Sequence, residues 1–236
     1  MDIMLFSSLT LMIFIIALIL IIVEKTIKAI AFSILTLIIF SVIFGSFVVQ
    51  DMRSLKENFL NDDKLIILQN KDEFITALIA GEELRYLNAE ETLFYTTYIK
   101  ERFYNTLLDD YYKIIFINVE ALENIDERIP IGEKVLMKNQ YILALTSNDP
   151  YSVLSKNGIS KEDLFKDPPF NIENDRITLR AALLAKIYDG YIKDPSFFVE
   201  NFKNNNIGLL PETAFFNLIK FLPGSAGKKL AAKFLE

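Results

Sequence analysis

Two long apolar runs near the start of the chain limit what it can fold into. Residues 3–23 and residues 29–49 contain no charged side chain, and a short charged segment, residues 24–28, separates them. About 20 apolar residues in a helix cross the roughly 30 Å hydrocarbon core of a bilayer, because each residue adds about 1.5 Å. Both runs reach that length. We therefore expect a transmembrane helical hairpin over residues 1–50, with spans at about 3–23 and 29–49, and a soluble domain over 51–236.

Positive charges near the spans predict the orientation of this hairpin. Lys25 and Lys28 lie between the runs, whereas the leading end carries no Lys or Arg. Since Lys and Arg favour the cytoplasmic side, this pattern places the turn inside and the soluble domain outside. Arg53, Lys56 and Lys64 favour the opposite orientation. We expect a two-pass integral membrane protein with an extracytoplasmic domain. A cleaved signal peptide is the alternative for the first run, although its apolar stretch is longer than the usual 7–15 residues.

Composition excludes several kinds of chemistry. The chain has no cysteine and no histidine, which removes thiolate metal sites, a thiol nucleophile and the commonest general base. The four charged side chains among residues 1–50 sum to zero, so the net charge of −6 belongs to residues 51–236. An acidic domain disfavours nucleic-acid binding, which needs a basic face. We predict no catalytic residues, no metal, no cofactor and no nucleic-acid partner, and we favour a non-enzymatic protein.

The soluble domain has the pattern of an α/β (α+β) fold with a small mixed sheet and a helix-rich C-terminal part. Short β-branched runs bounded by turn residues predict strands, and capping residues ahead of periodic apolar positions predict helices. We expect the chain to be helical from about residue 149 onward. The predicted strands are 64–69, 113–119, 135–137 and 141–146. The predicted helices are 72–80, 89–111, 149–158, 160–166, 175–191, 195–203 and 211–222.

Several groups of residues are candidates for binding. The predicted helix 89–111 is rich in tyrosine, and Tyr98 and Tyr104 are candidates for a ligand groove, although a core helix explains its apolar stripe as well. Adjacent carboxylates occur in four places, where they fit helix caps and turns better than a shared substrate site. These pairs are Asp62-Asp63, Glu82-Glu83, Glu90-Glu91 and Asp109-Asp110.

Two further groups suggest contacts in or on the membrane. Small residues in the second run allow close approach of another helix, unless the hairpin packs only against itself; these are Ala31, Ser41 and Gly45. The C-terminal segment alternates basic and apolar residues, which is typical of a helix lying on an anionic membrane surface or of lysines that complement a helix dipole. Its residues are Lys228, Lys229, Leu230, Lys233 and Phe234.

These observations favour a non-catalytic membrane-anchored protein that serves as an accessory or structural subunit of a larger membrane complex. Its expected partners are the lipid bilayer and other membrane protein subunits or further copies of itself. The first alternative is a membrane-tethered module that binds a small ligand or a peptide. The second is a carboxylate-based hydrolase, which would need two convergent acids with a raised pKa.

Overall fold

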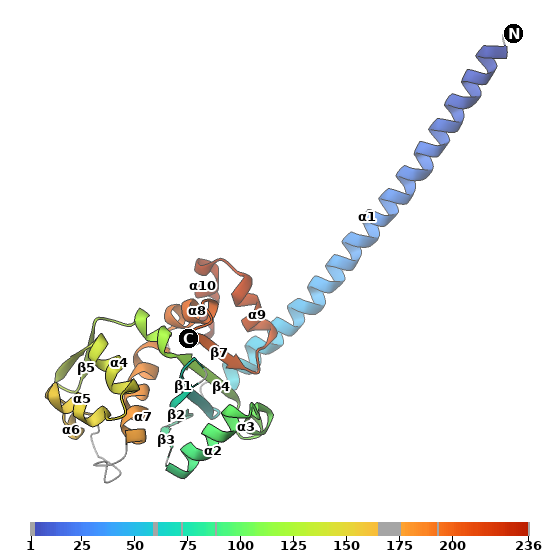
Figure 1. The fold of residues 1–236 in the computed structure, drawn as a ribbon. Coiled ribbons are helices and arrows are strands. Elements are labelled where there is room, and N and C mark those ends of the chain that lie inside the picture. The colour runs from blue at the N-terminus through green and yellow to red at the C-terminus, as the bar shows by residue number, and fades with distance from the viewer. Residues whose placement is uncertain are drawn as a thin grey trace. The chain divides into compact units, whose positions relative to one another are not determined.

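The computed structural model describes residues 3–58, 61–71, 73–87, 89–164, 176–192 and 194–235. The chain forms two compact units, residues 1–49 and residues 50–236. One helix, α1 (Ile3–Asn58), contains both apolar runs (Figure 1). It includes the one stretch of the described residues that is long and apolar enough to span a membrane, Phe14–Leu55. Only 6% of the most apolar window of this stretch is buried, whereas the core helix of a soluble domain is mostly buried.

The predicted two-helix hairpin is not shown, because α1 continues as a helix through residues 24–28. Within this segment the Thr26 hydroxyl donates to the carbonyl of Ile22 at 2.8 Å, and Lys28 pairs with Glu24 at 2.6 Å. The first glycine of the chain is Gly45, and no proline precedes it. Reversing the chain at residues 24–28 would break several backbone hydrogen bonds. Residues 24–28 contain no glycine or proline, the residues that usually interrupt a helix.

A five-stranded mixed sheet forms the centre of the second unit, with the strand order β3-β2-β1-β4-β7. β1 and β4 are parallel, and every other neighbouring pair is antiparallel. The parallel register places Leu65 beside Ile114 and Gln69 beside Asn118. The strands are β1 (Lys64–Asn70), β2 (Glu73–Ala80), β3 (Leu84–Tyr86), β4 (Lys113–Asn118) and β7 (Ile207–Leu210).

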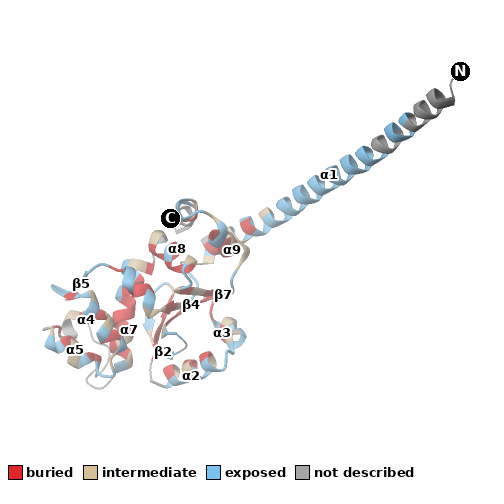
Figure 2. Cartoon of the chain, turned by 45° about the horizontal axis from the view of Figure 1, so that its top comes forward, coloured by how far each residue is buried: buried red, intermediate tan, exposed pale blue. Residues whose placement is uncertain are grey.

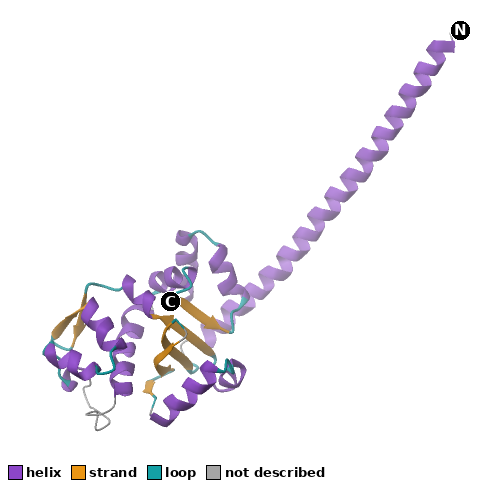
Figure 3. Cartoon of the chain, in the orientation of Figure 1, coloured by secondary structure: helices purple, strands orange, loops and turns teal. Residues whose placement is uncertain are grey.

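Helices cover both faces of this sheet. On one face, α2 (Ala89–Lys100) and α3 (Tyr104–Asp110) pack over a buried cluster that includes Ile67 and Ala77. On the other face, the hydroxyl of Thr76 donates to the carbonyl of Ile177, which lies in α7. Buried residues concentrate in the strands and in α7 (Figure 2), and Figure 3 distinguishes these strands and helices by colour. Coverage of both faces explains why β1 and β2 are nearly continuous apolar runs rather than alternating ones.

The remaining elements surround the sheet or form a smaller layer beside α7. β5 and β6 make an antiparallel hairpin whose turn contains Gly132 with φ +59°, a conformation that favours glycine. A Cβ at this position would also lie 3.2 Å from the carbonyl oxygen of Asp163. The elements are η1 (Val119–Asn124), β5 (Arg128–Ile131), β6 (Lys134–Met137), α4 (Lys138–Thr146), α5 (Pro150–Lys156), α6 (Lys161–Leu164), α7 (Arg176–Ile187), η3 (Tyr188–Ile192), α8 (Pro195–Lys203), α9 (Ala214–Phe221) and α10 (Gly224–Leu235).

The predicted strands at 64–69, 113–119 and 135–137 are confirmed, but two other predictions are wrong in type. Residues 73–80 form the interior strand β2 instead of a helix. Burial on both faces removes the alternation that identifies a strand, and Ala77, Leu78 and Ala80 also suit a helix. Residues 141–146 belong to helix α4 instead of a strand. The side chain of Gln140 accepts a hydrogen bond from the Met137 N–H and so closes the first turn of that helix.

Two further boundaries differ from those predicted. The helix expected over 89–111 is divided into α2 and α3 by residues 101–103, where Arg102 has φ +58°. Residues 207–210 form the edge strand β7, within a segment that we expected to be helical. Four residues of the predicted apolar stripe on 89–111 lie in the buried cluster under α2 and α3. They are Tyr95, Ile99, Leu107 and Tyr111.

The last turns of α1 are part of the second unit and are held there by polar contacts. The Asp51 carboxylate accepts a hydrogen bond from the N–H of Phe215 at 3.1 Å, and so caps α9, whose own N-cap residue Thr213 makes no side-chain cap bond. The hydroxyls of Ser54 and Tyr112 lie 3.3 Å apart, and Leu55 is fully buried. The segment that leaves the apolar helix is therefore fixed to the sheet domain.

Lys113 lies in the same region and is buried. Its ammonium group donates to the carbonyl of Pro211 at 3.0 Å and lies 5.2 Å from the centre of the Tyr112 ring. Burial lowers the pKa of Lys113 to about 8, although the nearby Asp51 carboxylate opposes this shift. Folding therefore disfavours the protonated form of this side chain.

Lys113 should make the free energy of unfolding depend on pH between pH 8 and 10. Below pH 8 both the folded and the unfolded chain bind the Lys113 proton, so the cost of burying the charge is fully present. Above pH 8 only the unfolded chain keeps it, and stability rises by at most about 1.4 kcal/mol per pH unit. Lys113→Met should remove this rise, whereas Lys156→Met, at an exposed position, should retain it. Urea unfolding of the full chain in detergent, followed by tyrosine circular dichroism, measures this; pH profiles of equal slope in all three proteins would contradict it.

Candidate functional site

A cavity lies at the edge of the sheet where the parallel strands β1 and β4 end. The carboxyl ends of neighbouring parallel strands are the usual place for a binding site in an open sheet. Gln69 and Asn118, which are paired in register, both line the cavity, and its volume is about 610 Å³. The full lining is Gln69, Ile99, Lys100, Arg102, Tyr104, Phe116, Asn118, Phe202, Asn205, Asn206, Ile207, Gly208, Leu209, Leu210, Glu212 and Lys220.

The apolar part of the cavity includes two aromatic rings and a glycine. Tyr104 from α3 and Phe116 from β4 meet edge to face, with ring centres 5.4 Å apart. Gly208 is the register partner of Phe116 on β7, and a Cβ at Gly208 would lie 3.6 Å from the Cβ of Phe116. The glycine therefore leaves room next to the Phe116 ring. A larger side chain at this position would fit the strand but would occupy part of the cavity.

The end of α2 contributes Arg102 to the cavity in an uncommon backbone conformation. The N–H of Phe103 donates to the carbonyl of Tyr98 and the N–H of Arg102 donates to that of Ile99, which is the Schellman pattern of a helix C-terminus. The rings of Tyr98 and Phe103 complete the motif, with centres 6.0 Å apart. Arg102 occupies the left-handed position, φ +58°, where glycine is usual. An arginine there costs stability.

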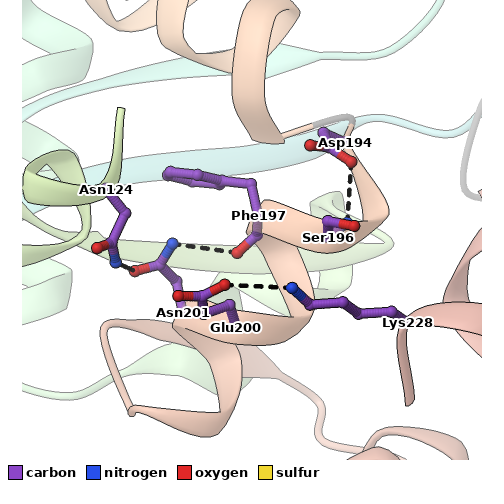
Figure 4. A network of polar contacts seen from close by, with 7 residues as sticks. All are labelled: Asn124, Asp194, Ser196, Phe197, Glu200, Asn201 and Lys228. Atoms are coloured by element: carbon purple, nitrogen blue, oxygen red, sulfur yellow. Dashed lines mark hydrogen bonds and ion pairs between the residues drawn. The ribbon is translucent and has the colours of Figure 1, made fainter. Parts of the chain in front are cut away.

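The end of α8 repeats this arrangement on the other side of the cavity. The N–H of Asn206 donates to the carbonyl of Asn201 and the N–H of Asn205 donates to that of Phe202, with Asn205 at φ +60°. The buried Asn201 fixes this turn, because its side-chain oxygen accepts hydrogen bonds from Asn124 at 2.9 Å and from Asn206 at 3.3 Å. Its own amide donates to the carbonyl of Phe197, as Figure 4 shows. Two of the three non-glycine residues with positive φ in the described segments therefore line one cavity.

The cavity carries a positive charge although the domain is acidic. Lys100 and Arg102 have no ion-pair partner within the described segments. Lys220 pairs with Glu212, and its ammonium group lies 4.8 Å from the centre of the Phe202 ring. Three cationic side chains and one carboxylate thus line the cavity. Two of the cations are available to a ligand.

An acidic cleft of about 910 Å³ lies at the opposite edge of the same sheet. Three of the four carboxylate pairs line this cleft together. The sequence predicted them only as separate helix caps and turns, and their proximity was not expected. Arg85 lines the cleft and pairs with Glu91 at 2.6 Å. Burial, followed by a hydrogen bond to Tyr95, raises the pKa of Tyr111 above its usual range. No group of three or more acidic side chains in the described part of the chain could hold a metal ion. The pairs in question are Asp62-Asp63, Glu82-Glu83 and Asp109-Asp110.

The structure separates the two tyrosines that were candidates for a ligand groove. Tyr104 lines the cavity, whereas Tyr98 is not among the residues of its lining. The ring of Tyr98 instead packs against Phe94 in a tilted arrangement and against Phe103 edge to face, with ring centres 4.2 and 6.0 Å away. Tyr98 therefore supports the end of α2, and through it the position of Arg102, from outside the cavity.

The candidate membrane contacts lie on α1 and α10. On α1, Ala31 and Ser41 are exposed, the Ser41 hydroxyl donates to the carbonyl of Leu37 at 2.7 Å, and no described atom lies within 4 Å of a Cβ placed on Gly45.

On α10, Lys228 pairs with Glu200 of α8 at 3.3 Å, Lys229 is exposed and Leu230 is half-buried. Lys233 and Phe234 also belong to α10, but their side chains lie outside the described part. Of these five residues, Lys228 is thus tied to the domain itself, while Lys229 remains available to a surface.

No family model, curated protein or solved structure matches this chain, so its function has to be inferred from its own residues. Sequence patterns did not predict Arg102, Asn118, Asn205 and Gly208 as residues of the site. The segment Asn204-Asn205-Asn206 followed by an apolar run with a glycine was the available signal, because asparagine tolerates the left-handed conformation that ends a helix before a strand.

Arg102→Gly should stabilise the domain. Glycine adopts positive φ without steric cost, so releasing the strain should raise the free energy of unfolding by about 0.5–1 kcal/mol, after the added freedom of the unfolded chain is subtracted. Arg102→Ala removes the same charge but keeps the Cβ, and should give no such gain. Thermal unfolding of both variants in detergent compares them. An equal gain from alanine would show that the charge, rather than the backbone strain, is responsible.

Proposed function

We propose that this chain is a non-catalytic membrane-anchored protein whose sheet domain acts at the membrane surface as an accessory subunit of a larger membrane complex. The observation that carries the proposal is the apolar helix α1 joined to a domain fixed at its base by Asp51 and Leu55. The absence of histidine and cysteine from the sequence supports a non-enzymatic role.

In a bilayer we propose that the two apolar runs cross as separate spans and that the chain reverses at residues 24–28. A straight helix of 56 residues is about 84 Å long, far more than the roughly 30 Å hydrocarbon core. Fourteen of the residues 29–49 are Ile, Leu, Phe or Val, and their insertion contributes roughly 4–8 kcal/mol. Keeping Glu24, Lys25 and Lys28 out of the core avoids roughly 2.5–3.5 kcal/mol for each charge. Insertion of the second apolar run and exclusion of the charged segment from the core therefore both favour reversal of the chain at residues 24–28.

Exposed apolar side chains on the domain support a protein partner. On and beside α2, Leu93 is 71% exposed, Phe94 46% and Phe103 56%. An apolar patch of this kind is typical of a surface that another protein covers. The small residues Ala31, Ser41 and Gly45 offer a second contact surface, for the helices of a partner or of another copy of the chain.

The second candidate function is a membrane-tethered module that binds a small ligand. The cavity at the carboxyl edge of the sheet favours it, because 610 Å³ lies within the usual range for small-molecule pockets and the lining combines apolar walls with a few polar groups. The two functions are compatible, since the cavity and the apolar patch on α2 involve different residues.

Cysteine labelling tests the two-pass topology. The natural chain contains no cysteine and therefore serves as the unlabelled control. Asp2→Cys, Thr26→Cys and Ser155→Cys report the leading end, the charged segment and the domain. In sealed membrane vesicles an impermeant maleimide should label Asp2→Cys and Ser155→Cys from the same side and Thr26→Cys from the other. Labelling of Asp2→Cys and Ser155→Cys from opposite sides would establish a single span.

Purification of the tagged full chain in mild detergent tests the accessory role. A membrane protein should co-purify in a fixed ratio and identify the complex by mass spectrometry. Gly45→Leu should weaken this association if the partner packs on α1, and Phe103→Ser should weaken it if the partner covers the α2 patch; Ser155→Ala is the control. A chain that is monomeric and free of any stoichiometric partner would contradict the proposal.

A further inference from the structure

We propose that the cavity at the carboxyl edge of the sheet binds a small organic anion, a carboxylate or a phosphate attached to an aromatic or apolar body. This inference rests on the second candidate function and adds the chemical class of the ligand.

The first support is the charge of the lining. Lys100 and Arg102 lack ion-pair partners in the described segments, although residues 51–236 as a whole carry a net charge of −6. At the opposite edge of the sheet the cleft lining contains six carboxylates and Arg85. The two edges therefore differ in sign, and an anion is attracted to the cavity and repelled from the cleft.

Lys100 and Arg102 could merely complement the negative end of the α2 dipole. Lys100 suffices for that role, because it lies in the last turn of α2 and keeps a helical backbone. Arg102 lies beyond the helix at a position where glycine is less strained. Dipole compensation does not explain an arginine there, whereas anion binding does, and strained residues concentrate at binding sites.

The second support is an unsatisfied amide on the cavity lining. The side-chain oxygen of Asn118 is buried and has no hydrogen-bond partner within the described part of the chain. A buried polar atom without a partner costs about 1–3 kcal/mol. In the orientation shown this oxygen only accepts, for example from a hydroxyl of the ligand. Rotation of the amide exchanges the oxygen for the NH₂ group and lets the residue donate to an anion.

The third support is the space beside Phe116. Gly208 adds no side chain beside Phe116, where a Cβ would be in ordinary van der Waals contact with Phe116, and the ring of Tyr104 meets Phe116 edge to face. An aromatic or apolar ligand body packs well against such rings. The cavity thus offers rings for the apolar body of a ligand and cations for the acidic group of the same ligand. Inorganic phosphate has no apolar body and would use only the cations.

Calorimetric titration of the purified full chain in detergent, at constant ionic strength and without phosphate buffer, tests the inference with matched probes. Benzoate should bind at least tenfold more tightly than neutral benzamide, and phenyl phosphate more tightly than phenol. Comparing benzoate with phenyl phosphate distinguishes a carboxylate from a phosphate ligand. Arg102→Gln and Lys100→Gln should each weaken benzoate binding at least threefold, and the double variant at least tenfold.

Gly208→Val should occupy the part of the cavity beside Phe116 and weaken benzoate binding at least tenfold without a change in charge. Lys156→Gln and Gly224→Ala are the matched controls and should bind as the natural chain does; thermal unfolding of every variant confirms its fold. Equal binding of benzoate and benzamide that is lost in Gly208→Val would overturn the anion inference but keep a binding module. If no probe binds, or if binding is unchanged in all cavity variants, both the anion inference and the ligand-binding function would be overturned.

Discussion

The parallel pairing of β1 and β4 is the constraint on which the rest of the domain depends. Parallel neighbours cannot be joined by a tight turn, so the chain between Asn70 and Lys113 must cross the sheet, and it supplies β2, β3, α2 and α3 on the way. The same pairing brings Gln69 and Asn118 together at one edge. It also brings Asp62-Asp63 and Asp109-Asp110 together at the opposite edge, where the antiparallel strand β2 adds Glu82-Glu83. The acidic edge thus follows from the pairing of β1 with both β4 and β2.

The two units of the chain differ in how their apolar side chains are covered. The domain of residues 50–236 buries the apolar side chains of its strands beneath its own helices. Residues 29–44 of α1 are exposed throughout. In the membrane-anchored protein that we propose, a bilayer covers them. Asp51 and Ser54 attach the end of this helix to α9 and to Tyr112, which precedes β4, and Leu55 is buried in the domain.

The sequence predicts those elements whose conformation depends on composition and short patterns. It does not predict elements whose conformation depends on contacts with residues distant in the chain. The helical conformation of both apolar runs, β1 and β4 follow from local sequence, whereas the union of the two runs in one helix was not predicted. Residues 73–80 could form a helix or a strand, and pairing with β1 in the middle of the sheet selects the strand. Tyr104 was a candidate ligand contact before the fold was known. The place of Gly208 and Asn118 in the cavity could not be predicted, because it depends on the pairing of β7 with β4.

The most direct test of the binding site is nuclear magnetic resonance of the full chain in lipid nanodiscs, with labelled amides, during a titration with benzoate. We predict that the backbone amide of Gly208 and the side-chain amide of Asn118 shift in a saturable manner. The amides of Glu82 and Glu83, at the opposite edge of the sheet, should not move. Shifts confined to the acidic cleft, or no saturable shift at Gly208 and Asn118, would contradict the account of the cavity as an anion site.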